Sequence, residues 1–235
     1  HSLFPQLIAG PIVRYREVED RIVRRPVSVD DVEYGIIRFC IGLAKKIILA
    51  DNMGVVADRI FSLGPAELSM TAAWVGIAAY TLQIFFDFSG YSDMAIGLGR
   101  ALGFRFPENF DQPYRSLSIT EFWRRWHISL SSFLRDYLYI PLGGNRKGPI
   151  RTYINLSATM ILGGLWHGAA WNFIAWGAYQ GFWLSIERLA GKRSLLSFAP
   201  KALQIAGTFI LVMFGWVLFR AADMSHALRH AGDML

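Results

Sequence analysis

Cysteine is almost absent from this sequence, with Cys40 as the single one in 235 residues. A disulfide within the chain is therefore impossible, and zinc sites built from several cysteines are excluded. The chain also lacks the Gly-x-Ser-x-Gly pattern that carries the nucleophile of many hydrolases. No glutamate precedes a histidine at the Glu-x-x-His spacing of helical di-metal sites, so we predict that the protein binds no metal.

Charged residues are also scarce. They make up 18% of the chain, against roughly 25% in ordinary soluble proteins. Hydrophobic residues reach 53%, aromatic residues 14%, and the mean hydropathy is +0.31. This composition predicts an integral membrane protein. The net charge of +6 then indicates basic cytoplasmic loops in contact with membrane lipid, and we expect no nucleic-acid partner.

Four apolar stretches are expected to form helices. The second and the fourth have about the 20 residues that a helix needs to cross a bilayer. The first contains Lys45 and Lys46, which argue against a plain lipid-facing span and predict that it tilts, extends its lysines to the membrane surface or lies against other helices. These observations predict an all-α fold, a multi-pass transmembrane helical bundle. The four stretches are residues 32–50, 70–88, 153–186 and 202–219.

The third stretch is too long for a single crossing, because a continuous helix of that length would span roughly 50 Å. We predict a break between Gly163 and Gly168, in the sequence GGLWHGAAW. His167 lies at this break. Irregular backbone at membrane depth is tolerated only inside protein or along a cavity, so His167 is a candidate general base or ligand there. The alternative is a packed histidine that forms hydrogen bonds across helices.

A second histidine, His127, lies in TEFWRRWHISLSSFLRDYLYIPLGG. We predict one amphipathic helix that begins at Thr120 and carries His127 on its apolar side, with Trp123 and Leu134. The alternative is an interfacial helix whose histidine is merely buried. Residues 100–151 are rich in arginine and lysine, so we expect this segment to face the cytoplasm.

Three long motifs carry a resemblance to a known family. They are FDFSGYSDMAIGLGRALGFRFPENFDQPY, SITEFWRRWHISLSSFLRDYLYIPLGGNRKG and GGLWHGAAWNFIAWGAYQG. Together they resemble the membrane-bound O-acyltransferase family, most closely the bacterial branch that acetylates exported polysaccharides such as alginate. The resemblance covers nearly all of residues 1–235, which we interpret as a single membrane domain. Because such proteins carry further helices, this sequence is expected to be a partial chain, with helices missing before residue 1 and after residue 235.

The resemblance implies an activity and its partners. The expected reaction moves an acetyl group from a cytoplasmic thioester, acetyl-CoA or a similar donor, towards a hydroxyl group of an exopolysaccharide. Periplasmic acetyl-transfer proteins are expected as partners, the inner membrane as the location, and no tightly bound cofactor. His167 matches the family's essential histidine, and His127 its second characteristic histidine on the cytoplasmic side.

Acyl transfer also requires groups that bind the donor and stabilise the oxyanion. Arg124 and Arg125 are candidates for binding the phosphates of CoA, although anionic lipid headgroups would suit them equally. Hydrogen bonds from backbone amides at the glycine break, or from the indoles of Trp166 and Trp171, could stabilise the oxyanion. Burial would keep the imidazole of His167 neutral and able to accept a proton.

Two rival functions use the same features. A membrane transporter would use His167 and the aspartates as a relay for protons or substrate. A non-catalytic scaffold subunit of a polysaccharide export complex would need neither histidine. Transporters usually contain paired broken segments from internal duplication, and this sequence contains no repeat. A scaffold would tolerate substitution of His167.

Overall fold

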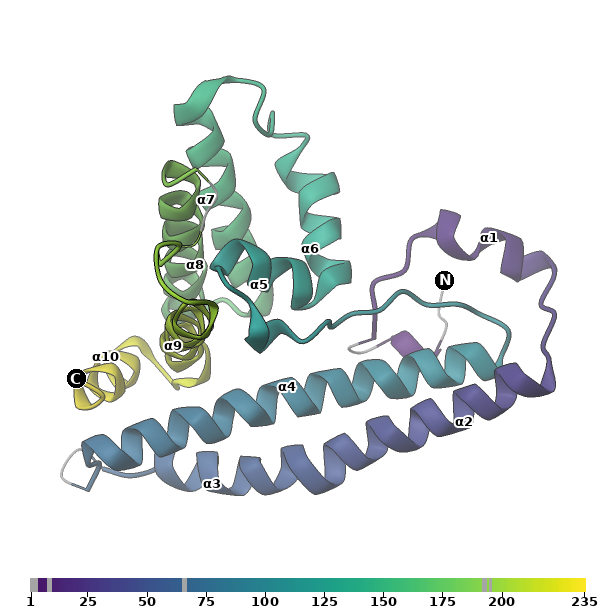
Figure 1. The fold of residues 1–235 in the computed structure, drawn as a ribbon, viewed down its shortest axis with the longest axis horizontal. Helices are drawn as coiled ribbons and strands as arrows, with labels where there is room; N and C mark the ends of the chain where they lie inside the picture. Colours follow the sequence, from purple (N-terminus) through teal and green to yellow (C-terminus); the bar gives the residue numbers. More distant parts are fainter. Residues whose placement is uncertain (1–3, 8–9, 65–66, 192–193, 195) are drawn as a thin grey trace.

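The computed structural model describes residues 4–7, 10–64, 67–191, 194 and 196–235, and in these residues the regular structure is helical (Figure 1). The β-type pairing in the described chain is one isolated bridge between Phe110 and Trp126. The prediction of an all-α fold is confirmed to this extent. The shorter elements are η1 (Phe4–Gln6), α1 (Tyr15–Val23), η3 (Pro113–Arg115), α5 (Ile119–Arg125), α6 (Ile128–Leu134), η4 (Arg135–Tyr139) and α10 (Met224–Asp233).

One long arm of the molecule consists of α2 (Val29–Ala44), the π-helix η2 (Lys45–Ala50) and α3 (Asp51–Phe61), which follow one another without a break. This arm lies along α4 (Met70–Ala101) (Figure 1). Its first turn is capped by Ser28, whose Oγ accepts the backbone N–H of Asp31 at 3.1 Å. The Asp31 side chain in turn accepts the backbone N–H of Ser28, which forms a capping box.

Glycines let the arm and α4 approach backbone to backbone. A Cβ at Gly42 would lie 2.5 Å from the carbonyl oxygen of Gly90, and one at Gly35 would lie 2.6 Å from that of Gly97. Such close approach is typical of packing between membrane helices.

The lysines of η2 also face α4. Lys45 Nζ lies 2.5 Å from Asp93 Oδ2, and Lys46 Nζ lies 2.8 Å from Asp87 Oδ1. The expectation that this lysine pair lies against another helix is confirmed, because both side chains form ion pairs with α4.

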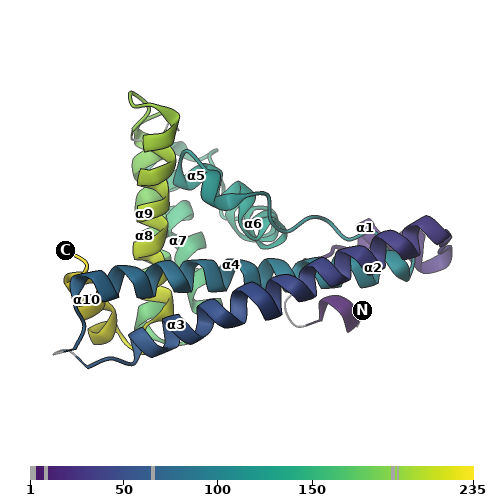
Figure 2. The same ribbon diagram turned by 60° about the horizontal axis from the view of Figure 1, so that its bottom comes forward.

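A second group of helices stands across this arm. It contains α7 (Gly148–His167), α8 (Trp171–Leu189) and α9 (Lys201–Arg220), which lie side by side (Figure 2). By length and composition α4 and α9 could each cross a membrane. The stretches predicted at 70–88 and 202–219 are therefore helical, and the first continues to Ala101.

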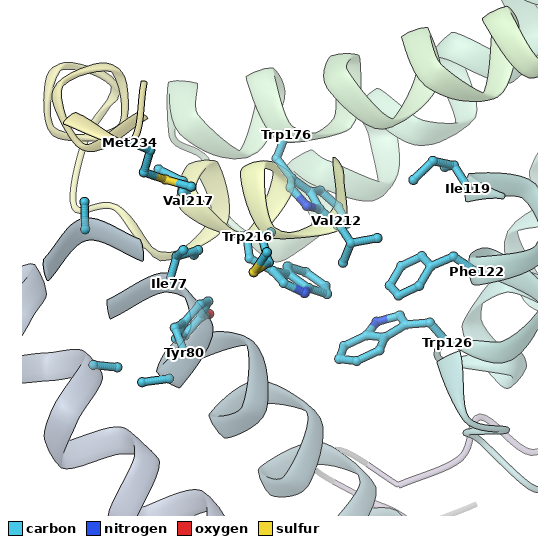
Figure 3. Packing of buried hydrophobic residues seen from close by; sticks show 14 of the residues in the cluster. Ile77, Tyr80, Ile119, Phe122, Trp126, Trp176, Val212, Trp216, Val217 and Met234 are labelled. Carbon is cyan, nitrogen blue, oxygen red and sulfur yellow. The ribbon is translucent and has the colours of Figure 1, made fainter. Parts of the chain in front are cut away.

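An aromatic cluster joins the two groups of helices (Figure 3). Trp216 of α9 is 2% exposed and lies 4.9 Å from the ring of Trp126, measured between ring centroids. Phe122 of α5 stacks on Trp126 at 5.6 Å, and Ile77 of α4 belongs to the same buried cluster. Each aromatic pair contributes about 0.5–1.5 kcal/mol beyond the area it buries. The cluster therefore fixes the end of α5, immediately before His127.

Candidate active site

His167 is the last residue of α7, and α8 begins at Trp171. The predicted break in residues 153–186 is therefore confirmed, although Gly163 remains helical and the chain turns only after His167. The turn brings α8 back against α7. A Cβ at Gly177 would overlap the carbonyl oxygen of Met160 and lie 2.8 Å from Cα of Ile161. This contact between backbones holds the end of α7 in place.

The His167 ring is half-buried and surrounded by aromatic side chains. Its centroid lies 5.5 Å from Trp176, 5.0 Å from Phe219 and 5.0 Å from Trp166, each in an edge-to-face arrangement. Neither ring nitrogen forms a hydrogen bond with a described residue. Both ring nitrogens are therefore available to a substrate.

His167 lines a cavity of about 270 Å³ between α6, η4, α7 and α8, which we call the His167 cavity. Trp176 lies beside His167 at one end, and aliphatic side chains such as Leu156 and Leu184 form the walls. Arg135 and Arg188 bring positive charge to the lining. The remaining lining residues are Trp123, Leu130, Ser131, Leu134, Tyr139, Asn145, Thr159, Met160 and Gly163.

The single amphipathic helix predicted around His127 is wrong. The helix ends at Arg125 and a new one begins at Ile128, with His127 between them in the left-handed region at φ 44°. The cause lies in a distant segment, because the backbone N–H of Ile128 donates to the carbonyl oxygen of Asn109 at 3.0 Å. A left-handed backbone in a non-glycine residue costs free energy and is often found at functional sites.

Asn109 holds the His127 side chain as well. His127 Nδ1 lies 3.0 Å from Asn109 Oδ1, which also accepts the backbone N–H of Ser129 at 3.2 Å and its hydroxyl at 2.8 Å. The Asn109 amide nitrogen donates to Ser92 Oγ at 3.1 Å. The carbonyl oxygen of an amide only accepts, so Nδ1 of His127 carries the proton and Nε2 keeps its lone pair.

The two histidines lie on either side of the aromatic cluster. Trp126, next to His127, contacts Trp216; Trp216 lies 6.2 Å from Trp176, and Trp176 contacts His167. His127 is 5% exposed, and only His167 is part of the cavity lining. The structure thus brings both predicted histidines into one region but gives them different access.

Arg124 and Arg125 do not line the His167 cavity. They line a separate cavity of about 590 Å³ beside α5. Arg125 forms ion pairs with Glu121 at 2.8 Å and Asp111 at 3.4 Å, whereas Arg124 has no ion pair among the described residues. The structure therefore separates these two candidates from His167.

Other sequence candidates serve structural contacts. Asp87 and Asp93 pair with lysines of η2, and the part of the chain that the structure describes holds no group of three metal-ligating side chains. Trp166 and Trp171 are 64% and 76% exposed and lie outside the cavity lining.

Sequence reasoning missed the charged residues of the His167 cavity. Arg188 follows Leu184 by four residues on α8, a spacing that places these two on one face, and both line the cavity with Trp176. Arg135 is bound to Asp136 at 2.7 Å. Hydrogen bonding from Arg135, with help from Arg14, lowers the pKa of Asp136 to about 2, so this carboxylate stays ionised at neutral pH.

Comparison with known proteins shows which family the chain resembles. The family model of the membrane-bound O-acyltransferases (MBOAT) matches residues 1–222. The chain is 55% identical over 234 residues to the probable alginate O-acetylase AlgI of Pseudomonas fluorescens, covering 99% of this chain and 46% of that protein. It is 44% identical over 233 residues to the peptidoglycan O-acetyltransferase of Helicobacter pylori, covering 97% and 44%.

The name of a more distant relative refers to the transfer of a different acyl group. The chain is 28% identical over 242 residues to the teichoic acid D-alanyltransferase of Bacillus subtilis, covering 95% of this chain and 60% of that protein. The chain spans about half the length of the alginate and peptidoglycan relatives it matches.

Proposed function

Because the chain belongs to the membrane-bound O-acyltransferase family, we propose that it forms part of a membrane enzyme that transfers an acetyl group from a thioester to a hydroxyl group of an exported polysaccharide. The observation that carries this proposal is the position of His167, an imidazole without a hydrogen-bond partner in the described chain that lines the cavity between α7 and α8. The names of the relatives, alginate O-acetylase and peptidoglycan O-acetyltransferase, support the class of acceptor.

In the proposed reaction His167 acts as the general base. It takes the proton of the acceptor hydroxyl while the oxygen attacks the thioester carbonyl carbon, so that a C–O bond forms and the C–S bond breaks. The thiolate leaves, and the imidazolium returns the proton to it. No charge is left on the protein after one turnover. The aromatic walls around His167 exclude water, which favours a neutral imidazole before the reaction.

His127 has a supporting role in this proposal. Its Nδ1–H is fixed by Asn109, and its ring is 5% exposed, so reacting atoms do not reach it as readily as they reach His167. We expect His127 to act through the aromatic cluster, because Trp126 contacts Trp216, and Trp216 lies against Trp176 beside His167. His127 is thus expected to affect the use of the acyl donor more than proton transfer itself.

The acyl donor enters from the cytoplasm in this proposal, and the protein lies in the inner membrane. The basic segment 100–151 contains Arg135, which lines the His167 cavity. The positive-inside rule assigns such a segment to the cytoplasm. On the far side, periplasmic acetyl-transfer proteins and an exopolysaccharide would receive the acetyl group.

Cysteine labelling tests this orientation. Cys40 is exposed, so the test uses full-length protein with Cys40→Ala and one new cysteine, Asn145→Cys. An impermeant maleimide added to intact cells should leave Asn145→Cys unmodified. It should modify Ser225→Cys, a matched site in α10 beyond the far end of α9. Labelling of Asn145→Cys from outside would reverse the orientation.

Polymer chemistry tests the function. A strain that lacks the gene should produce exopolysaccharide with little acetyl ester, and the full-length gene should restore it. A His167→Gln version at the same membrane abundance should not restore it. Restoration by His167→Gln would favour a scaffold, because a scaffold does not need the imidazole.

A further inference from the structure

We propose that Arg188 binds the phosphate of a phosphopantetheine thioester, the group shared by acetyl-CoA and acetylated carrier proteins, at the end of the His167 cavity far from His167. This inference rests on the proposed function and assigns the donor's anchoring residue. It replaces Arg124 and Arg125 as the phosphate-binding candidates, because neither lines the cavity that reaches His167.

Arg188 is the cation of this cavity that no carboxylate neutralises. It has no ion pair among the described residues. Its neighbour Glu187 is 3% exposed and accepts the backbone N–H groups of Ile119 at 2.6 Å and Thr120 at 2.8 Å. The carboxylate of Glu187 is thus committed to the first turn of α5 and does not neutralise Arg188.

The second arginine of the cavity is already paired. Arg135 Nε lies 2.7 Å from Asp136 Oδ1, and Asp136 is ionised at neutral pH. Tyr139 and Asn145 lie in the same lining and are hydrogen-bonded to each other through the Tyr139 hydroxyl. Asp136 is shared with Arg14 at 2.6 Å, so Arg188 is the arginine of this lining without an ion pair in the described residues, and it lies among polar groups that suit a phosphate.

The register of α8 sets the length of the donor. Arg188 lies twelve residues after Trp176 on the same helix, a separation of roughly 18 Å at 1.5 Å per residue. Trp176 contacts the ring of His167. A donor that reaches both His167 and Arg188 must therefore keep its phosphate and its reactive carbonyl far apart. Compact donors such as acetyl phosphate do not meet this requirement, whereas a phosphopantetheine thioester does.

The walls between these two ends suit such an arm. Leu134, Leu156 and Leu184 supply aliphatic contact for its methylene groups. Thr159 lies among them and donates its hydroxyl to the carbonyl oxygen of Asn155 at 2.7 Å, which leaves its oxygen lone pairs free to accept an amide N–H of the arm.

The test compares donors with and without phosphate. Full-length wild type and Arg188→Gln are assayed for acetyl transfer with acetyl-CoA, with an acetylated acyl carrier protein and with acetyl-pantetheine. The substitution should raise KM on the order of tenfold to hundredfold for each phosphate-bearing donor that the wild type uses. It should leave KM for acetyl-pantetheine within about twofold. Arg188→Lys should recover part of the loss, since it restores the charge without the fork geometry.

A binding measurement in which no acetyl group is transferred tests the role of Arg188 independently of the proposed function. The dissociation constant of desulfo-CoA, which cannot transfer an acetyl group, should rise for Arg188→Gln by a similar factor. Arg151→Gln is the matched control, because Arg151 is an exposed arginine of α7 outside the cavity lining. It should bind desulfo-CoA as the wild type does.

Two results would overturn the assignment of Arg188. One is equal loss with acetyl-CoA and acetyl-pantetheine, which would mean that Arg188 supports the fold or binds an anionic lipid headgroup. The other is unchanged affinity for desulfo-CoA in Arg188→Gln together with a large loss in Arg124→Gln, which would place the phosphate in the cavity beside α5. If the wild-type protein binds desulfo-CoA but transfers no acetyl group from any of the donors, the result would count against the proposed function instead.

Discussion

The two histidines of the candidate site are built in opposite ways. His127 is held by a network that reaches across the chain to Asn109 and Ser92, and its ring is almost fully buried. His167 ends a helix, has no hydrogen-bond partner in the described residues and lines a cavity. The first is fixed and lies outside the cavity lining, and the second is part of that lining. A fixed imidazole suits the role of positioning, whereas an open one suits proton transfer.

Of the substitutions that distinguish the two histidines, loss of His167 should lower the activity most. His167→Ala in the full-length protein should lower kcat on the order of 10²–10⁴-fold, because a general base is lost. The measurement is steady-state acetyl transfer at saturating donor, with thermal unfolding in detergent as the control for folding. An activity within a few-fold of wild type would mean that the open histidine is not the base.

Loss of His127 should have a smaller effect of a different kind. His127→Ala should raise KM for the acyl donor by about tenfold and leave measurable kcat, the pattern of lost ground-state binding. Asn109→Ala should change KM in the same direction, since it removes the acceptor that orients the imidazole. If His127→Ala is as inactive as His167→Ala at saturating donor while still folded, the two histidines form one catalytic unit.

The smallest effect on activity is expected from a substitution that shifts His167 and leaves His127 in place. Gly177→Ala places a Cβ against the backbone of Met160 and Ile161, and it should cost about 1–3 kcal/mol of stability. Thermal unfolding and acetyl transfer measured together should show a lower Tm and reduced kcat, because the end of α7 shifts with His167.

The matched control for this change is Gly232→Ala. A Cβ at Gly232 in α10 meets no atom within 4 Å, so this variant should keep its activity and gain slightly in stability. A Gly177→Ala protein with wild-type Tm and kcat would show that the contact between α7 and α8 does not position His167.

The sequence was sufficient to predict the structure where neighbouring residues determine it. The break after His167 follows from the length of an apolar run and from its glycines. The helices at 70–88 and 202–219 follow from hydropathy. The structure near His127 does not follow from local rules, because its backbone is set by hydrogen bonds to Asn109, eighteen residues away in the sequence.

Charge was harder to interpret than hydropathy. Arg124 and Arg125 stand out in the sequence because they are adjacent, yet α5 directs them to a cavity that His167 does not line. Arg188 is inconspicuous in the sequence and lies in the same cavity as His167. Helical periodicity predicts which residues share a face, but only the packing of α8 against α7 and η4 decides which face borders the site.

The π-helix η2 bears on how insertions and deletions act in this chain. A π-turn holds one residue more than an α-turn. The segment η2 therefore accommodates one additional residue in a wider turn within an otherwise continuous helix. Deletion of one residue from Lys45–Ala50 should restore α-helical phase without ending the helix. Because the wide turn accommodates the additional residue locally, α3 would then keep about the same face towards α4, whereas the same deletion within α2 would rotate the following residues by about 100°. This segment should therefore tolerate a one-residue deletion better than the α-helices on either side of it.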